Sequence, residues 1–291
     1  MISAWFFAFT YPLVWAFMNI LDKYVVTRKV KQPLSFAVLA GIVNILFGIL
    51  LGIFLDWSNI GIKDMIFPAI AGIFLGLQFY IYFLILQKED AAPMVSFVFV
   101  YPILIALLSY IFLGEVISVI GYFGMFLILI GVVALSFRMK KIKLEIGVWM
   151  IILMIILVAA YEFFIKVATI NIPEFNGMAI SGVALGLTIL PALLYKKTRE
   201  GFAYTLRNIK WAFINESFTY LAVILTYFAM AKLPATIVSS VGAIQPLAVL
   251  FFENIADRIL GGKLTKDKEI LPKLIPIILI VLGVVLIYAF S

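Results

Sequence analysis

The stretch Phe137-Arg138-Met139-Lys140-Lys141-Ile142-Lys143 divides the 291-residue chain into two parts of nearly equal length. Each part consists of long apolar runs that short charged segments separate. The last run before this basic stretch contains Gly131-Val-Val, and the last run of the chain contains Gly283-Val-Val. The same triplet at the same place in both parts indicates an internal duplication about the basic stretch.

The composition predicts an all-α integral membrane protein. Hydrophobic residues make up 65% of the chain and charged residues 13%, and the mean hydropathy is +1.19. Soluble domains contain roughly 45–50% apolar and about 25% charged residues. The chain has no Cys and no His, so it lacks disulfides, thiolate nucleophiles and imidazole ligands. The net charge of +7 we assign to loops at the membrane surface rather than to a nucleic-acid partner.

Ten apolar runs are long enough to cross a bilayer, which takes about 20 residues. Because each part contains five of them, an odd number, the two copies must be inserted in opposite orientations. The sequence therefore predicts a five-helix repeat over 1–137, a basic cytoplasmic hinge over 138–145 and a second five-helix repeat over 146–291. The ten predicted spans are 2–21, 34–55, 65–86, 91–113, 116–137, 147–165, 177–195, 211–231, 235–256 and 271–290.

The distribution of basic residues predicts the orientation. If the chain has ten spans, the loops of one side, which include the hinge, contain 19 of the 22 Lys and Arg residues. Cytoplasmic loops carry the excess of Lys and Arg in membrane proteins. We therefore expect a multi-pass protein of the plasma membrane with a cytoplasmic hinge and both termini outside. The connection 196–210 is predicted either to lie flat on the membrane surface or to be a solvated linker.

Aligning the two copies pairs polar residues within the spans. The alignment sets Asn19 opposite Glu162 and Lys23 opposite Lys166. It also sets Ala91 to Pro102 against Ala235 to Pro246, which places Tyr101 opposite Gln245. Inverted repeats are characteristic of secondary transporters, which bind substrate between the copies and alternate access by rocking them.

Several of these residues together resemble the EamA-type repeats of the drug/metabolite transporter superfamily. The resemblance implies ten helices in two inverted halves and a central cavity lined by the first, third, fourth, sixth, eighth and ninth spans. Two features depart from the family. Its members usually keep both termini in the cytoplasm, and the second Leu-Gly-Glu is replaced here by Gly261-Gly262-Lys263. The residues that carry the resemblance are Trp15-Ala16 with Lys23, Ala91-Ala92-Pro93, Tyr101-Pro102, Leu113-Gly114-Glu115 and the two Gly-Val-Val triplets.

Polar and aromatic residues inside the spans are candidates for the substrate site, because such groups are costly in lipid. Interhelical hydrogen bonding by the glutamines and a membrane-interface role for the tyrosines are the alternatives. Pro102 and Pro246 are predicted to break their helices and to free the carbonyls of Val98 and Gly242 toward a cavity, or to form simple kinks. The candidate substrate-binding residues are Gln78, Tyr82, Tyr101, Tyr220 and Gln245.

Charged residues in the spans are candidates for gates and for energy coupling. Glu162 and Lys166 share one helix face at a spacing of four residues, near the outer surface. The corresponding Asn19 and Lys23 lie near the inner surface. Our hypothesis is a pair of pseudo-symmetric gates, with Glu162 as the proton-coupling residue. The alternatives are lysines that extend to lipid head groups and a permanent Glu162–Lys166 ion pair. The further coupling candidates are Glu216 and Glu253.

The sequence favours a secondary transporter of a small polar or amphipathic metabolite, working by alternating access, with protons as the candidate coupling ion. A flippase for a lipid or a lipid-linked sugar is the alternative within the same fold. A membrane enzyme is disfavoured, since no His, Cys, Gly-x-Ser-x-Gly or paired-carboxylate motif is present. We expect no cofactor, no metal site and no nucleic-acid partner. The expected partners are the substrate, protons and membrane lipids, in a monomer or a homodimer.

Overall fold

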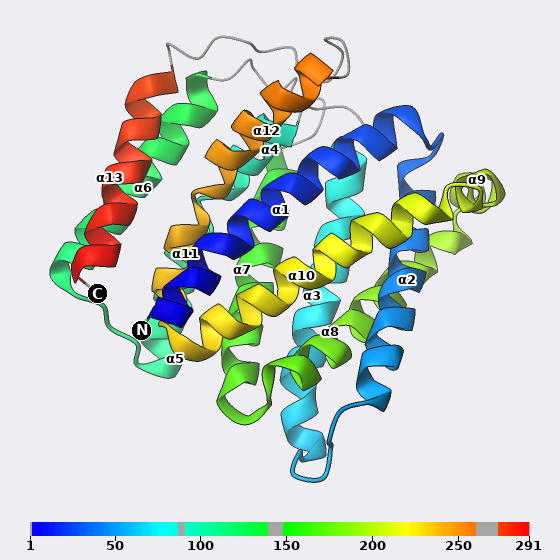
Figure 1. The fold of residues 1–291 in the computed structure, drawn as a ribbon, viewed down its shortest axis with the longest axis horizontal. Coiled ribbons are helices and arrows are strands. Elements are labelled where there is room, and N and C mark those ends of the chain that lie inside the picture. Colours follow the sequence, from blue (N-terminus) through cyan, green and yellow to red (C-terminus); the bar gives the residue numbers. More distant parts are fainter. Residues whose placement is uncertain (1, 87–90, 139–147, 260–272, 291) are drawn as a thin grey trace.

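The computed structural model describes residues 2–86, 91–138, 148–259 and 273–290, and within these ranges it contains helices and connections but no β-strand (Figure 1). The predicted all-α class is confirmed. Apart from Arg138 the predicted hinge lies outside the described residues, as does Gly261-Gly262-Lys263. The α-helices are α1 (Ile2–Arg28), α2 (Pro33–Ile53), α3 (Ile62–Leu86), α4 (Ala91–Val98), α5 (Pro102–Leu113), α6 (Val119–Arg138), α7 (Val148–Asn171), α8 (Glu174–Ile189), α9 (Lys196–Leu206), α10 (Ile209–Lys232), α11 (Ala235–Gly242), α12 (Gln245–Ile259) and α13 (Leu274–Phe290); a 3₁₀ turn, η1, spans Leu190–Leu194.

The helices are those of a multi-pass membrane protein. Among the described residues, eight helical stretches are long and apolar enough to cross a membrane, and two further apolar helices, within α6 and α13, are shorter. α4 and α5 form one of the eight stretches together, and α11 and α12 form another. The prediction of ten spans in inverted repeats stays a prediction.

α6 and α13 pack against each other at one edge of the molecule, on the left in Figure 1. Their contact depends on the two glycines of the repeated triplets. A Cβ atom on Gly131 would stand 2.7 Å from Ile280 Cγ1, and one on Gly283 would stand 2.7 Å from Ile128 Cγ1 and would overlap the carbonyl of Gly124. Small residues let helix backbones approach closely in membranes. The outward faces of both helices are apolar and more than half exposed, at Phe123, Phe126, Ile278 and Val285.

The remaining contacts are reciprocal between the two parts of the chain. α1 packs against α10, and α7 packs against α3, while α2 packs against α8. Figure 1 shows α1 and α10 crossing the front of the view together, with α3 and α7 behind them. Each part therefore contributes its first helix to the other part's third long helix, and the centre of the molecule lies between these two helix pairs.

Two helices are interrupted at the predicted prolines. α4 ends at Val98 and α5 begins at Pro102, while α11 ends at Gly242 and α12 begins at Gln245, just before Pro246. Proline lacks the N–H that would continue the helix ladder. At the first break the Val98 carbonyl accepts a bond from the Tyr101 N–H instead (3.1 Å). Both breaks lie near the centre of the molecule, beside the cavity described below.

The connection 196–210 is mostly a packed helix. α9 extends over Lys196–Leu206, and two of its threonines, Thr198 and Thr205, are fully buried. The Ser35 hydroxyl, at the start of α2, donates to the Thr198 carbonyl (2.7 Å). A solvated linker is therefore excluded, and α9 is anchored to the start of α2.

Candidate functional site

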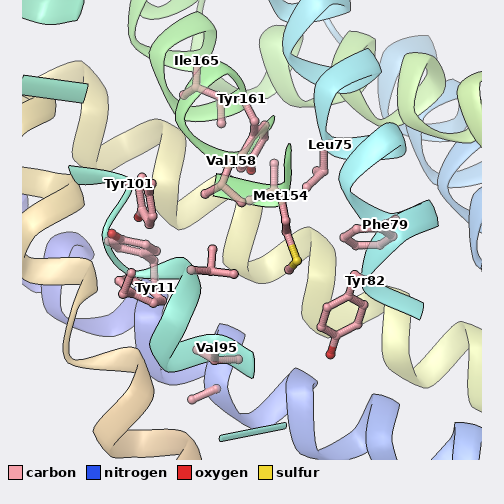
Figure 2. Packing of buried hydrophobic residues seen from close by; sticks show 14 of the residues in the cluster. Tyr11, Leu75, Phe79, Tyr82, Val95, Tyr101, Met154, Val158, Tyr161 and Ile165 are labelled. Carbon is pink, nitrogen blue, oxygen red and sulfur yellow. The ribbon is translucent and has the colours of Figure 1, made fainter. Parts of the chain in front are cut away.

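A small central cavity lies between α1, α3, α4, α7 and α12. Its volume is about 60 Å³, well below the roughly 300–1,000 Å³ of typical ligand pockets. The conformation is therefore closed, with room for little more than water. Figure 2 shows Tyr11 and Tyr101 at one side of the cluster and Phe79 and Tyr82 at the other. The lining residues are Tyr11, Trp15, Met18, Asn19, Leu75, Gln78, Phe79, Tyr82, Val95, Val98, Phe99, Tyr101, Met154, Val158, Tyr161, Glu162 and Gln245.

Six of the predicted site residues meet in this cavity. Four of the five substrate candidates are among them, and so are two of the gate candidates. They come from α1, α3, α7, α12 and the break between α4 and α5, so residues far apart in sequence converge on one space. The six are Asn19, Gln78, Tyr82, Tyr101, Glu162 and Gln245.

Glu162 is the acidic residue of the cavity, and it is only 5% exposed. The Tyr101 hydroxyl donates to its Oε1 (2.6 Å). Its other oxygen, Oε2, is buried and has no hydrogen-bond partner among the described residues. The prediction that Glu162 lies near the outer surface is wrong, because α7 carries this residue to the centre of the bundle.

The chemistry of this carboxyl group follows from its surroundings. A buried carboxylate is costly unless it is paired or hydrogen-bonded, and a single hydroxyl donor satisfies only one of the two oxygens. Oε2 can therefore bind a proton, a cation or another hydrogen-bond donor that enters the cavity. Tyrosine and tryptophan rings in the wall favour a cation as well, because the faces of aromatic rings attract positive charge.

On the opposite wall, Asn19 joins three helices. Its Nδ2 donates to the Tyr82 hydroxyl on α3 (2.9 Å), and its Oδ1 accepts from Gln245 Nε2 on α12 (2.8 Å). An amide with both of its polar atoms bonded is well suited to a buried position. Asn19 and Glu162 therefore share a cavity but differ in charge and in hydrogen-bond saturation.

Lys166 lies away from the cavity and holds the end of α10. Its Nζ donates to the carbonyls of Met230 (2.8 Å) and Leu233 (2.9 Å) and forms an ion pair with Glu115 (3.1 Å). The predicted pair between Lys166 and Glu162 is therefore not formed. A cation at a helix C-terminus is stabilised by unpaired carbonyls and by the helix dipole.

Lys23 has the corresponding role at the end of α3. It is 8% exposed, and its Nζ donates to the Leu86 carbonyl (3.0 Å). The alternative in which Lys23 and Lys166 extend to lipid head groups is wrong for both, because each side chain turns inward to a helix end.

Glu115, which the sequence placed only within the Leu-Gly-Glu motif, completes the cluster around Lys166. α5 ends at Leu113 and is followed by Gly114, whose φ of +63° is a left-handed conformation that glycine adopts readily. This turn lets Glu115 Oε2 accept the N–H of Ala235, the first residue of α11 (2.7 Å). A carboxylate at a helix N-terminus is favourable, so Glu115 connects α11 with Lys166 on α7.

Besides the two lysines, three predicted residues lie outside the cavity lining. Tyr220 does not line it, because its hydroxyl donates to the Asn44 carbonyl (2.9 Å) in a separate contact of α10 with α2. Glu216 also faces α2 and accepts from Asn44 Nδ2 (2.6 Å). Glu253 is buried on α12 but does not contribute to the cavity wall.

Among the aromatic residues of the wall, Tyr82 and Tyr101 were predicted from the sequence, whereas Tyr11 and Tyr161 were not. Tyr11 donates to the Val238 carbonyl (2.9 Å), and the buried hydroxyl of Tyr161 has no partner among the described residues. Aromatic residues within apolar runs carry little positional signal, because Tyr and Trp are also common at membrane interfaces. The one signal that could have identified Tyr161 is its place directly before Glu162.

Fold and cavity together define a polytopic helical membrane protein with a polar site enclosed between two sets of helices. Residues 2–137 match the model of the EamA-like transporter family. This part of the chain is therefore similar to the EamA-like transporter family, as the sequence motifs indicated.

Comparison with solved structures supports the fold over the whole chain. In all, 28 chains of solved structures match. One of them, a crystal structure described only as that of a protein, is 18% identical with a TM-score of 0.66, over 99% of this chain and 97% of that chain. At this identity the likeness concerns the fold alone. The search of curated proteins found no match.

Proposed function

We propose that the protein is a secondary transporter of the plasma membrane that alternates access to the central cavity between two inverted halves, 1–137 and 146–291. Three observations support this. Residues 2–137 match the model of a transporter family, the cavity is lined from both halves, and the packing of α1 on α10 mirrors that of α7 on α3. The small volume of the cavity corresponds to a closed state from which each side opens in turn.

The observation that carries the substrate class is the unpartnered Oε2 of Glu162. A negative oxygen that faces an aromatic cavity is suited to a small amphipathic organic cation, whose ammonium group would bind the carboxylate and whose apolar part would contact the rings. Cation–π attraction reaches about 2 kcal/mol in desolvated sites. Lys166 cannot neutralise Glu162, because its ammonium group is already bound to Glu115 and to two carbonyls.

Proton coupling follows from the same oxygen. A proton and an organic cation would compete for Glu162, so binding of one would release the other. A ligand shifts a conformational equilibrium only by its difference in affinity for the two states. Exchange of proton for cation would supply that difference at one site, and the corresponding Asn19 cannot take part because an amide does not titrate.

The test is a matched ligand series on the detergent-purified protein. Phenethylammonium, phenethyl alcohol and phenylacetate have similar apolar parts and differ in charge. We expect only the cation to raise the unfolding temperature, and its effect to weaken as the pH falls, because protons then occupy Glu162. Equal stabilisation by the alcohol would contradict a charge-selective site.

A flippase remains the second candidate, because one apolar groove opens sideways toward the lipid. It has a volume of about 330 Å³ and lies between α1, α10 and α12. At its end the rings of Tyr24 and Trp211 are 5.4 Å apart, and Lys29 Nζ lies within 5.7 Å of both ring centres. Such a groove suits an acyl chain with an anionic head group. Proteoliposomes that scramble fluorescent lipid without moving labelled phenethylamine would favour this function.

The orientation is part of the same proposal. The positive-inside distribution of Lys and Arg predicts that a reporter fused after Ser291 behaves as extracytoplasmic and one inserted at Lys140 as cytoplasmic. The opposite result would mean that the orientation usual in the family overrides the charge distribution.

A further inference from the structure

A second buried polar cluster lies between α1, α2 and α10, outside the lining of the central cavity. Its members are Asp22, Asn44, Asn215 and Glu216, each at most 1% exposed. Asn215 Nδ2 donates to Asp22 Oδ1 (2.9 Å) and to Glu216 Oε1 (3.1 Å). Asn44 Nδ2 donates to Glu216 Oε2 (2.6 Å). A single amide thus joins two carboxyl groups from the two parts of the chain.

The charged groups around this cluster do not balance it. Neither carboxyl group forms an ion pair with a basic side chain of the described residues, and Lys23 directs its Nζ to the Leu86 carbonyl. The other titratable groups that face the cluster are the hydroxyls of Tyr82 on α3 and Tyr220 on α10. α2 carries no titratable residue. α12, which also packs against α1, carries the buried acids Glu253 and Asp257 and the exposed Arg258.

Two like charges at one buried site cannot both be ionised without a large cost. One member of the pair must therefore be neutral, which means that it carries a proton. The buried Oδ1 of Asn215 points to the same conclusion, because it has no hydrogen-bond partner and a buried acceptor left unbonded is unfavourable. A half-turn of this amide would present Oδ1 to a protonated carboxyl group.

A continuous series of polar contacts leads from this cluster to the cavity. The Tyr82 hydroxyl interacts with Asp22 and accepts from Asn19 Nδ2 (2.9 Å). Asn19 Oδ1 in turn accepts from Gln245 Nε2 (2.8 Å). Tyr82, Asn19 and Gln245 all line the cavity, so Tyr82 lies between Asp22 and the two hydrogen bonds of the cavity wall.

We infer that Asp22 and Glu216 form a second proton-binding site, which is joined to the cavity through Tyr82, Asn19 and Gln245. This site is distinct from the proton- and cation-binding site proposed at Glu162, which lies on the cavity wall opposite Asn19. Loss of the proton places a second negative charge at the interface of α1 with α10, one helix from each half. Proton binding here therefore stabilises the closed packing of the halves, and this consequence for transport rests on the proposed function.

The decisive measurement is an infrared pH titration of the full-length purified protein without ligand. A protonated carboxyl group has a C=O stretching band that the carboxylate lacks. We expect the wild type to show such a band, to which Glu162 also contributes, and the double variant Asp22→Asn/Glu216→Gln to lose the part that belongs to the pair. The matched control Glu162→Gln should keep that part. Identical bands in the wild type and the double variant would overturn the inference.

If the double variant does not fold, the single variant Asp22→Asn tests the same claim. Once the carboxyl group of Asp22 has been removed, Glu216 must titrate in a different pH range. An unchanged titration would again overturn the inference. Replacing KCl by NaCl should leave the bands as they are. A sodium-dependent loss of the proton band would assign the site to a metal cation instead.

The link to the cavity is tested with phenethylammonium and the variant Tyr82→Phe. Binding, measured by thermal shift, should move the titration of the pair in the wild type and leave it unmoved in Tyr82→Phe. A cation that binds without moving the wild-type titration would overturn the link. A cation that does not bind contradicts the proposed function, while the ligand-free titration still decides whether the two-carboxyl site exists.

Discussion

The first helices of the two halves, α1 and α7, occupy corresponding places but present different chemistry to the cavity. On α1 the residue is Asn19, whose amide bonds Tyr82 and Gln245. On α7 it is Glu162, which has one bonded and one unbonded oxygen. One turn further along, both helices carry a lysine that holds a helix end, Lys23 on α3 and Lys166 on α10. The lysines are thus structural in both halves, and the cavity charge comes from α7.

The largest effect is expected from removing that charge. Glu162→Gln should weaken binding of phenethylammonium by about 30- to 700-fold, because losing a buried charge partner costs about 2–4 kcal/mol and each 1.4 kcal/mol is a factor of about ten. Thermal-shift titration measures it, with Asn19→Asp as the matched variant of the other half. If Glu162→Gln binds the cation as well as the wild type, Glu162 is not the cation site.

The lysine clusters should matter for stability rather than for binding. Lys166→Met leaves Glu115 without its cation, and we expect it to destabilise the fold by about 1–3 kcal/mol, the usual cost of a lost hydrogen bond to a charged group. The control is Lys196→Met on α9, whose pair with Glu200 is 3.9 Å long and largely exposed and is therefore expected to contribute under about 1 kcal/mol.

Chemical denaturation in detergent compares these two variants, with binding measured per folded molecule. Equal stability of Lys166→Met and Lys196→Met would show that the buried cluster does not hold α10 and α11 in place. A loss of cation binding in Lys166→Met at full stability would instead favour the gate role that the sequence predicted for Lys166.

The sequence predicted the membrane class, the helix breaks at Pro102 and Pro246 and most polar residues of the cavity, because isolated polar groups in apolar runs are conspicuous. It placed Glu162 too far outward, because the depth was inferred from Lys166, which was taken as the outer end of the predicted span 147–165, whereas α7 continues to Asn171. The alternative of a Glu162–Lys166 ion pair followed from spacing along one helix, whereas the structure pairs Lys166 with Glu115, a residue 51 positions away by their numbers. Partners of this kind depend on how helices pack, which local spacing does not contain.

The same limit explains the second polar cluster. Asp22 and Asn215 are 193 positions apart, and both lie near ends of apolar runs, where charged and amide residues are usually solvated. Only the packing of α1 on α10 buries them together. Tyr220 was assigned to the cavity for the opposite reason, because a tyrosine in the correct span can still face the neighbouring helix.

A smaller effect is expected from the hydroxyl that bonds Glu162. Tyr101→Phe removes the donor to Oε1 (2.6 Å) and leaves the ring in the wall. The carboxylate loses about 1–2 kcal/mol of stabilisation, so protons should compete more strongly and cation binding should weaken about 5- to 30-fold at neutral pH. Raising the pH should restore part of the affinity. Unchanged affinity at every pH would show that the hydroxyl does not stabilise the charged form.

The smallest effect distinguishes the two glutamines of the cavity, which lie on α3 and α12. Gln245 donates to Asn19 (2.8 Å), while Gln78 lines the cavity without a recorded hydrogen bond to another described residue. Gln245→Leu should therefore lower the stability by about 0.6 kcal/mol, the average for an interhelical hydrogen bond in a membrane protein, and Gln78→Leu should leave it unchanged. Both replacements should weaken ligand binding if the glutamines contact the substrate once the cavity opens.

Denaturation curves and thermal-shift titrations of the two variants separate these effects. A loss of stability with normal ligand binding assigns a glutamine to helix packing. A loss of ligand binding with normal stability assigns it to the substrate site. Equal stability losses would contradict the contrast between the two sides of the cavity, because only Gln245 belongs to the hydrogen-bonded series through Asn19.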